Sequence, residues 1–172
     1  MSEPGKFERG TLIFSVIYNS DRWFAEFRLE VKRKYGKIIS VSEPFEFSID
    51  YYKKEMGEGL RRRFIVMEVT GLMEMLVEAK LWAFGFEVYS SRGEKRAVNI
   101  DPAILFTPAL FVATFKSFSH RVPLSKGVYA HLELLFSKGI PRPLPWTYPD
   151  FASGKYNDFL EEAWKIHRHL RG

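Results

Sequence analysis

The spacing of apolar positions divides the first third of the chain into short strands and one amphipathic helix. Residues 12–18 form a β-branched and aromatic run, which is typical of a buried strand. Apolar side chains then recur at helical spacing between the N-cap candidates at 19–21 and Gly36, a residue type that favours the end of a helix. Residues 38–41 predict the next strand, and residues 45–47 predict its extension.

The middle of the chain continues this pattern. Residues 50–59 predict a loop or a short helix, and residues 63–69 predict a strand. Thr70 and Gly71 are expected to open a helix with one apolar face, and residues 95–100 predict another short strand. The order strand, helix, strand, strand, helix, strand predicts a ferredoxin-like core, in which an antiparallel sheet carries both helices on one face.

The last third of the chain predicts additions to this core. A Thr-Pro start favours a short helix over residues 108–115, and a strand over residues 110–114 competes closely with it. Residues 121–136 predict a hairpin, and residues 156–170 predict an amphipathic helix. We therefore expect an α+β fold, with a single domain over residues 1–172 that has a ferredoxin-like βαββαβ core, a C-terminal hairpin and a C-terminal helix.

Composition and charge narrow the class of partner. The chain has 172 residues and a net charge of +5, which favours anionic partners such as nucleic acid, nucleotides or phosphorylated metabolites. A solvated, lysine-rich surface is the competing interpretation, because no long Lys/Arg run is present. The lack of cysteine excludes disulfides, thiolate metal sites and cysteine nucleophiles. The lack of Gln and the 27% of charged residues form a thermophile-like bias.

The sequence indicates neither membrane insertion nor a known cofactor motif. No apolar run reaches the ~18 residues that span a bilayer, and the first residues lack a secretory pattern, so we expect a cytoplasmic protein with no membrane partner. The phosphate-loop, dinucleotide-binding, zinc-binding and nucleophile-elbow patterns are absent. The sequence therefore identifies no cofactor and no oligomeric state.

Several motifs resemble those of an uncharacterised bacterial family that is catalogued as a domain of unknown function. They are Tyr-Tyr-x-x-Glu-Met-Gly at 51–57, Asn-Ile-Asp-Pro at 99–102, His-Arg at 120–121 and Trp-Thr-Tyr-Pro-Asp at 146–150. Together with further short matches they cover nearly the whole chain in order. The family usually has Gly after Asp-Pro, where this chain has Ala103. The resemblance supports the position of a site and implies no particular reaction.

Two groups of polar and aromatic residues are candidate pocket walls. Asn99 and Asp101 follow a predicted strand, and Asp101 is either a metal-ligating or general-base carboxylate or an Asx turn that stops the strand. Glu55 beside Tyr51 and Tyr52 indicates a pocket wall, although a lone charged residue is usually solvated. The sequence does not decide whether a divalent metal joins these carboxylates.

The strongest catalytic candidate is the cluster at residues 116–121. His120 titrates near neutral pH and can move protons, while Lys116 and Arg121 can hold a phosphate or a carboxylate. The competing interpretation is an Arg at a strand end that pairs with a core carboxylate, next to a half-buried His. The two interpretations have equal weight at the level of sequence.

Trp146, Tyr148 and Asp150 form a fourth candidate group, in a segment with prolines on both sides. They provide either an aromatic wall for a base or ring, or a rigid arm that docks the last helix. Asp150 fits a ligand-binding carboxylate, a further metal-ligand candidate, and equally a cap for the C-terminal segment.

Two functions from different classes fit these clusters. In the first, the protein binds, and in one version turns over, a small phosphorylated or nucleotide-like anionic ligand, with His120 and Asp101 as catalytic residues. We then expect at least these two residues and Arg121 to line one cavity. In the second, the protein is a non-catalytic RNA-binding or protein-interaction module, for which no RNA-binding motif is present. Base stacking on the sheet requires solvent-facing aromatic residues, namely Phe14, Tyr18 and Phe64.

Overall fold

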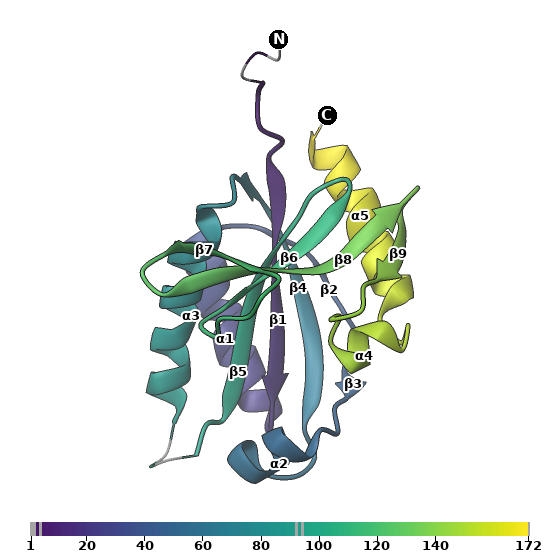
Figure 1. Ribbon diagram of the computed structural model, residues 1–172. Coiled ribbons are helices and arrows are strands. Elements are labelled where there is room, and N and C mark those ends of the chain that lie inside the picture. Colours follow the sequence, from purple (N-terminus) through teal and green to yellow (C-terminus); the bar gives the residue numbers. More distant parts are fainter. Residues whose placement is uncertain (1–2, 4, 92, 94, 172) are drawn as a thin grey trace.

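One antiparallel sheet organises the molecule. The computed structural model describes residue 3 and residues 5–91, 93 and 95–171. In this part of the chain, nine strands pair in the order β2-β4-β1-β5-β6-β8-β7, with β3 beside β4 and β9 beside β8 (Figure 1). The strands are β1 (Gly10–Tyr18), β2 (Ile38–Val41), β3 (Phe45–Glu46), β4 (Arg61–Gly71), β5 (Val98–Leu105), β6 (Ala109–Thr114), β7 (Arg121–Ser125), β8 (Val128–Ser137) and β9 (Ile140–Pro143).

The helices cover both faces of this sheet, which makes the fold a mixed α/β one. Those in the described part of the chain are α1 (Asp21–Tyr35), α2 (Asp50–Met56), α3 (Met75–Ser90), α4 (Pro149–Ala152) and α5 (Asn157–Arg171). α1 and α3 share one buried core with the sheet, and α4 and α5 share another on the opposite face. None of the helices described is both long enough and apolar enough to cross a membrane.

β1 lies at the centre of the sheet and is buried along its whole length. Phe14 packs against Phe27 of α1, with 5.6 Å between the ring centroids. Its neighbour Ile13 faces the opposite core, which contains Phe64 and Phe159. Because helices cover both faces, residues in both alternating positions of the strand are apolar, and the sequence shows a continuous apolar run.

The elements predicted from periodicity are present with shifted ends. α1 ends before Gly36, whose φ of 86° is easily adopted only by glycine. The segment expected as a loop or short helix contains α2, and the predicted hairpin and last helix are β7–β8 and α5. Residues 45–46 do not extend β2. They form the separate strand β3, which pairs with β4.

Two predicted helix starts are wrong. Thr70 and Gly71 belong to β4, where they pair with the first residues of β1, and α3 begins only at Met75. Glycine leaves room here for the end of the Met75 side chain, which would have to shift if residue 71 carried a Cβ. Residues 109–114 form β6 instead of the favoured helix over 108–115, since they pair with β5 and β8 inside the sheet. The competing strand prediction is therefore the correct one.

β5 and β6 pair over only a short length. Their pairing starts at Ala103 and Val112 and ends at Leu105 and Leu110, and β6 then runs alongside β8. The first half of β5 therefore pairs with β1 on one side only, and α3 lies against its other edge (Figure 1). This separation of β5 from the outer strands opens the sheet where polar side chains of β1, β4 and β5 gather.

Asp101 lies in the middle of β5, where it pairs with Ser15, so its interpretation as an Asx turn is wrong. Pro102 is tolerated in this central strand. The N–H of Ile100 points toward α3, and because backbone direction repeats every two residues, the N–H that Pro102 lacks would also point away from β1. Ala103 is not among the described residues with positive φ, so the chain needs no glycine there.

Candidate functional site

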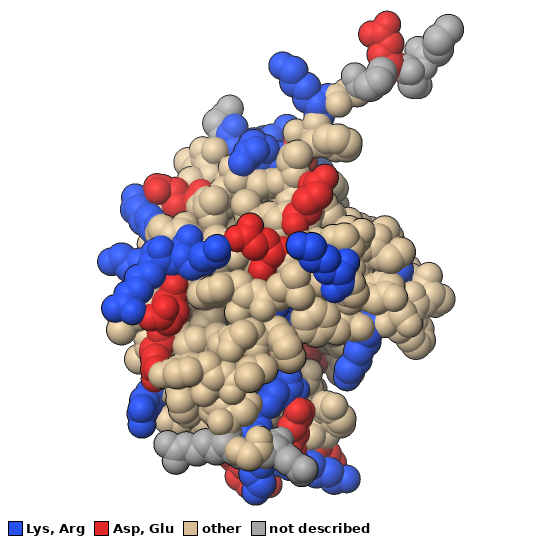
Figure 2. Space-filling model, turned by 90° about the vertical axis from the view of Figure 1, so that its left-hand side faces the viewer, with Lys and Arg blue, Asp and Glu red and all other residues tan. Residues whose placement is uncertain are grey.

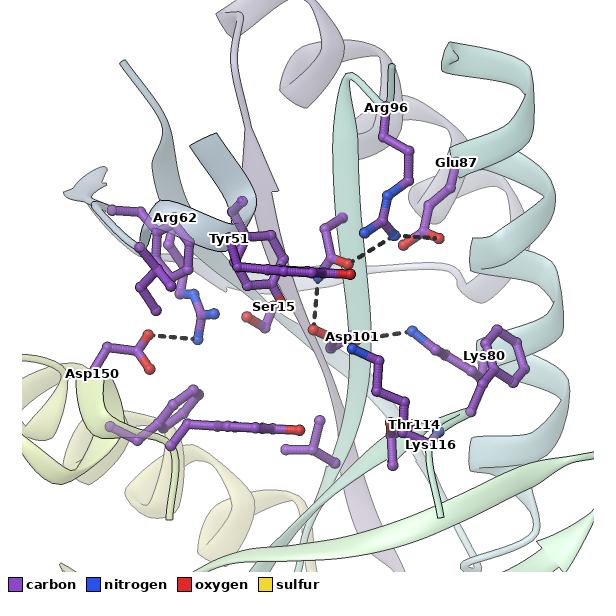
Figure 3. A pocket seen from close by; sticks show the side chains of 18 of the residues that line it. Ser15, Tyr51, Arg62, Lys80, Glu87, Arg96, Asp101, Thr114, Lys116 and Asp150 are labelled. Carbon is purple, nitrogen blue, oxygen red and sulfur yellow. Dashed lines mark hydrogen bonds and ion pairs between the residues drawn. The ribbon is translucent and has the colours of Figure 1, made fainter. Parts of the chain in front are cut away.

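A cavity of about 210 Å³ opens where β5 and β6 separate. Its floor comes from β1, β4 and β5, and its walls come from α2, α3, α4 and the segment after β6 (Figure 3). The volume is below the ~300–1,000 Å³ that is common for drug-sized ligands, so it suits a smaller molecule. The sequence-predicted residues in its lining are Tyr51, Tyr52, Asn99, Asp101, Lys116, Tyr148 and Asp150.

Two charged side chains of α3 satisfy the open edge of β5. The Lys80 ammonium donates to the Ile100 carbonyl at 2.9 Å, and Glu87 Oε1 accepts the Ile100 N–H at 2.6 Å. Both side chains are buried and line the cavity, and the sequence analysis missed both. The available signal was their separation by seven residues, which places two isolated charges on one face of a mostly apolar helix.

Asp101 is held as a charged carboxylate in the cavity floor. Its Oδ1 lies 2.9 Å from Lys80 Nζ, and its Oδ2 accepts a hydrogen bond from Asn99 Nδ2 at 2.9 Å. Burial alone would raise the pKa of Asp101, but Lys80, Arg62 and Asn99 together outweigh burial and lower it. Glu87 shows the opposite balance, because burial raises its pKa more strongly than the neighbouring cations lower it.

Arg62 and Asp150 form a buried ion pair on the other side of the floor. Arg62 Nη1 lies 3.1 Å from Asp150 Oδ2, and the Tyr156 hydroxyl donates to the same oxygen at 2.7 Å. The guanidinium also lies over the rings of Phe47 and Phe151, at 4.8 and 5.1 Å from their centroids. These contacts engage Nη1 and the faces of the guanidinium. Its Nε is buried and has no hydrogen-bond partner in the described part of the chain.

Ser15 is the second buried group without a partner in this floor. Its side chain lies between Arg62 and Asp101 (Figure 3). The residue is only 4% exposed, and its Oγ makes no hydrogen bond to any described residue. A buried polar group without a partner costs roughly 1–3 kcal/mol, so the two such groups in this floor require an explanation.

Arg96 joins the candidate Glu55 to the cavity. Glu55 does not line the cavity, but its Oε1 lies 2.7 Å from Arg96 Nε. Arg96 Nη1 reaches Glu87 at 3.5 Å and donates to Asn99 Oδ1 at 3.0 Å. The pKa of Arg96 is raised: burial opposes the charged form, but the bond to Glu55 and the charge of Glu87 outweigh it. Glu55 is therefore a neutralising partner of a wall residue.

Lys116 and Tyr51 face each other across the cavity mouth. Lys116 follows β6, Tyr51 lies on α2, and the Lys116 ammonium is 5.1 Å from the centre of the Tyr51 ring. Both side chains are exposed, and no ion pair found among the described residues includes Lys116. Deeper in the wall, burial raises the pKa of Tyr52, with the Asp101 charge acting in the same direction.

His120 and Arg121 do not line this cavity, so the expectation that they share it with Asp101 is wrong. His120 stacks on Trp146 with 4.7 Å between ring centroids, and its Nε2 lies 2.9 Å from His131 Nδ1. Trp146 is also outside the lining, and its indole N–H donates to a carbonyl of β8. The cause is the β7–β8 pairing, which directs these side chains toward the buried His131.

Arg121 braces the cavity wall from behind. Its Nη2 donates to the Tyr148 hydroxyl at 3.2 Å, and its Nη1 donates to the Lys116 carbonyl at 2.8 Å. Its Nε donates to His131 Nδ1 at 3.1 Å. Burial, and then the charge of Asp101, raise the pKa of Tyr148 to about 12, so this hydroxyl stays protonated. Arg121 therefore connects two lining residues to the interior of the outer strands.

Glu133 completes this interior network, and the sequence analysis missed it. Its Oε1 accepts the Tyr148 N–H at 2.8 Å, and its Oε2 is hydrogen-bonded to His131 Nε2. Arg121 can only donate, so His131 Nδ1 is an acceptor and its proton is on Nε2. The Nε2–H of His120 is then also directed at this acceptor. A His-x-Glu pair within a strand, with both side chains on one face, is the signal that was available.

The described residues contain no group of three or more metal-ligating side chains. Each carboxylate considered as a metal ligand is instead paired with a cation of the protein. Asp101 is paired with Lys80, Glu55 with Arg96, and Asp150 with Arg62.

The sheet cannot stack bases on the aromatic residues proposed for that role. Phe14 and Tyr18 are fully buried and Phe64 is 2% exposed, because helices cover both faces of the sheet. The requirement that these three rings face solvent is therefore not met.

Comparison with known proteins gives a family and no activity. A family model described as "Domain of unknown function (DUF4416)" matches residues 8–167, and the chain belongs to this family. No curated protein and no solved structure matches the chain.

Proposed function

We propose that this member of the DUF4416 family binds a small, ring-containing anionic ligand, phosphorylated or nucleotide-like, in the cavity between β5 and β6. The observation that carries the proposal is the pair of buried donors without partners in the cavity floor, Ser15 Oγ and Arg62 Nε. A ligand oxygen placed between them would accept both hydrogen bonds and remove their desolvation cost.

An exposed cation at the cavity mouth supports an anion. Four cations, Arg62, Lys80, Arg96 and Lys116, line the cavity with three carboxylates, and Glu55 adds a fourth carboxylate from behind Arg96. Lys116 at the mouth is the cation that remains available to a ligand, because the other three are paired with carboxylates.

Aromatic walls support a ring in the ligand. Tyr51, Tyr52 and Tyr148 line the cavity, and Tyr148 is held by its backbone N–H, its ring face and its hydroxyl. Such side chains can stack on a ligand ring or contact it edge to face, and each contact stabilises the complex by roughly 0.5–1.5 kcal/mol. With a volume of about 210 Å³, the cavity fits one part of a nucleotide, and the remainder would lie over the exposed rim.

Binding is favoured over turnover. Both oxygens of Asp101 are engaged and its pKa is lowered, which makes it a weak proton acceptor at neutral pH. His120 is outside the cavity lining. The sequence suggested Asp101 and His120 as catalytic partners. Their contacts instead stabilise the cavity floor and the structure behind its wall, and no catalytic role is needed to explain either residue.

We also infer a ferredoxin-like core made of β1, α1, β2, β4, α3 and β5. Support comes from the sheet order β2-β4-β1-β5, the antiparallel pairing of these strands and the common core shared by α1 and α3. On this inference the cavity lies on the sheet face opposite the core that α1 and α3 share. α3 supplies one wall at the edge of β5, and the added segments, including α2, α4 and the segment after β6, build the others.

The proposal is tested by calorimetric titration with inorganic phosphate, nucleoside monophosphates and the matching nucleosides. We expect the phosphorylated ring compounds to bind and the nucleosides to bind at least roughly tenfold more weakly, which corresponds to ~1.4 kcal/mol. Lys116→Ala should weaken the binding of the phosphorylated compounds by a similar factor. Lys32→Ala on the exposed surface of α1 removes the same charge and should leave affinity unchanged.

Two results contradict the proposal. One is the absence of binding for every phosphorylated probe at low salt. The other is an equal loss of affinity in Lys116→Ala and Lys32→Ala, which would indicate general attraction to a basic protein and not a site.

A further inference from the structure

α3 presents an apolar face to solvent. Along residues 78–90 its large exposed apolar side chains are Leu81, Phe84, Val88 and Tyr89, which are 36%, 48%, 58% and 65% exposed. Figure 2 shows a broad area over α3 that has no Lys, Arg, Asp or Glu, bordered by charged side chains. On a soluble protein, a contiguous apolar patch of a few hundred Å² marks an interaction site.

The apolar character of this face follows from where α3 places its charges. Lys80 and Glu87 are directed inward to the edge of β5 and are 5% and 3% exposed. On an ordinary surface helix such residues would make the outer face polar. Here both faces are largely apolar, which is the pattern of a helix that is covered on all sides.

Gly85 lies at the centre of the exposed face. A glycine inside a helix costs roughly 1 kcal/mol relative to alanine. Nothing in this chain requires it, because a Cβ at this position would meet no atom within 4 Å. Gly85 instead forms part of a surface groove with Trp82, Phe86 and Tyr89. A missing side chain in an exposed groove permits close approach of a helix from another molecule.

We propose that a second copy of this chain covers the face, with the two α3 helices packed antiparallel and crossing at Gly85. A two-fold axis at this residue would place Leu81, four residues before it, against the partner's Tyr89, four residues after it. The face is self-complementary, because apolar residues occupy both sides of Gly85, and the exposed Glu78 at its end already pairs with Lys34 of α1.

The available area matches a dimer contact. Phe115, which is 40% exposed, extends the face through its edge contact with Phe84, 5.6 Å between centroids. Taking ~200 Å² for a fully exposed aromatic side chain, Phe84, Tyr89 and Phe115 together expose roughly 300 Å², and the aliphatic residues add to this. The apolar part of a standard interface is roughly 450–500 Å² per partner.

The flanking charges favour a protein over an anionic lipid surface. α1 borders the face with the ion pairs Arg22–Glu26 and Arg33–Glu30. Attraction to an anionic membrane requires a cluster of basic residues without acidic neighbours, and these pairs are neutral. They are suited to the polar rim of a protein interface.

The first test measures the mass of the full chain by sedimentation equilibrium across the micromolar to sub-millimolar range. We expect twice the 20.1 kDa of one chain. Gly85→Lys should return the mass to that of one chain while the protein keeps a cooperative unfolding transition, because the new side chain has open space and a better helix propensity. Ile140→Lys, at an exposed apolar position of β9 on the side of the molecule away from α3 (Figure 1), is the matched control and should stay dimeric.

The second test uses the absence of native cysteine. Gly85→Cys should form a disulfide-linked dimer on mild oxidation, because two-fold symmetry brings the two positions together, whereas Ile140→Cys should not. A wild-type chain that remains monomeric throughout the concentration range overturns the proposal, whether or not it binds anionic vesicles. A dimer that persists in Gly85→Lys and does not cross-link in Gly85→Cys also overturns it, because its interface lies elsewhere.

Discussion

Lys80 on α3 and Asp101 on β5 form an ion pair with 2.9 Å between Nζ and Oδ1, at the one edge of β5 that β6 leaves uncovered. The same ammonium donates to the Ile100 carbonyl. Lys80 thus satisfies a strand edge and a cavity carboxylate at once. The pair explains why a lysine is buried in an otherwise apolar helix surface.

Replacing this lysine should destabilise the fold strongly. Lys80→Met removes the partner of a largely buried carboxylate and of a backbone carbonyl, and we expect a loss of roughly 3–5 kcal/mol in the free energy of unfolding. Urea denaturation measures the effect. The control is Lys34→Met, which breaks the exposed Lys34–Glu78 pair and should cost about 0–1 kcal/mol. Similar losses in both variants would contradict the structural role of Lys80.

Ser15 and Ser42 are both 4% exposed serines that should respond to alanine in opposite ways. Ser15→Ala removes a buried hydroxyl without a partner, so the protein alone should become more stable, by about 1 kcal/mol. Ser42→Ala removes a hydroxyl that accepts the Phe64 N–H at 2.9 Å and should cost roughly 1–2 kcal/mol. Thermal unfolding without added ligand gives both values. A loss of stability in Ser15→Ala would mean that its hydroxyl already has a good partner.

Glu133 must accept two hydrogen bonds, from His131 Nε2–H and from the Tyr148 N–H. Glu133→Gln keeps the shape but supplies only one acceptor oxygen, so one buried donor should lose its partner. We expect a loss of roughly 1–3 kcal/mol, measured by urea denaturation. Glu161→Gln on α5, whose carboxylate has no described hydrogen bond or ion pair, is the control. A Glu133→Gln variant with the same free energy of unfolding as the wild type would contradict the assigned His131 tautomer.

His120 should titrate below its ordinary pKa of 6.5, because partial burial and the neighbouring His131 and Arg121 disfavour its charged form. The unfolded chain then takes up the proton first as the pH falls. The free energy of unfolding should therefore decrease as the pH falls below 6.5, the pKa of His120 in the unfolded chain, and should stop decreasing below its lower pKa in the folded protein.

An NMR titration of the His120 ring protons measures this pKa directly. Arg121→Met removes the neighbouring cation and should raise the midpoint toward 6.5. Arg28→Met, an exposed position on α1, should leave the midpoint where it is. A wild-type midpoint at or above 6.5 would contradict the prediction.

Local periodicity determined which segments of this chain form most of the regular elements. α1 and α5 have apolar side chains at helical spacing, and β1 is a β-branched and aromatic run, so short-range sequence suffices for them. β6 shows the limit of such patterns. A Thr-Pro start favours a helix locally, but pairing with β5 and β8 supplies partners for the backbone along the whole segment.

For the candidate site, the sequence indicated chemistry-bearing residues, and the tertiary structure decided which of them meet. Asn99, Asp101, Lys116, Tyr148 and Asp150 line one cavity because β5 and β6 separate after three paired positions. The pairing of β7 with β8 directs His120 and Arg121 behind the wall, toward His131. The register of the strands and the point where they separate depend on contacts between distant segments. The spacing of residue types along the chain does not specify those contacts.

The burial of Lys80 and Glu87 could not be predicted from the sequence for the same reason. Lys80 and Glu87 interrupt an apolar helix, and by sequence alone such residues belong on its solvent face. Only the unpaired edge of β5 reverses this, because Ile100 offers a donor and an acceptor that must be satisfied. The sequence by itself determined the helix. The strand edge beside it decided which face of that helix is charged, and so left the outer face apolar.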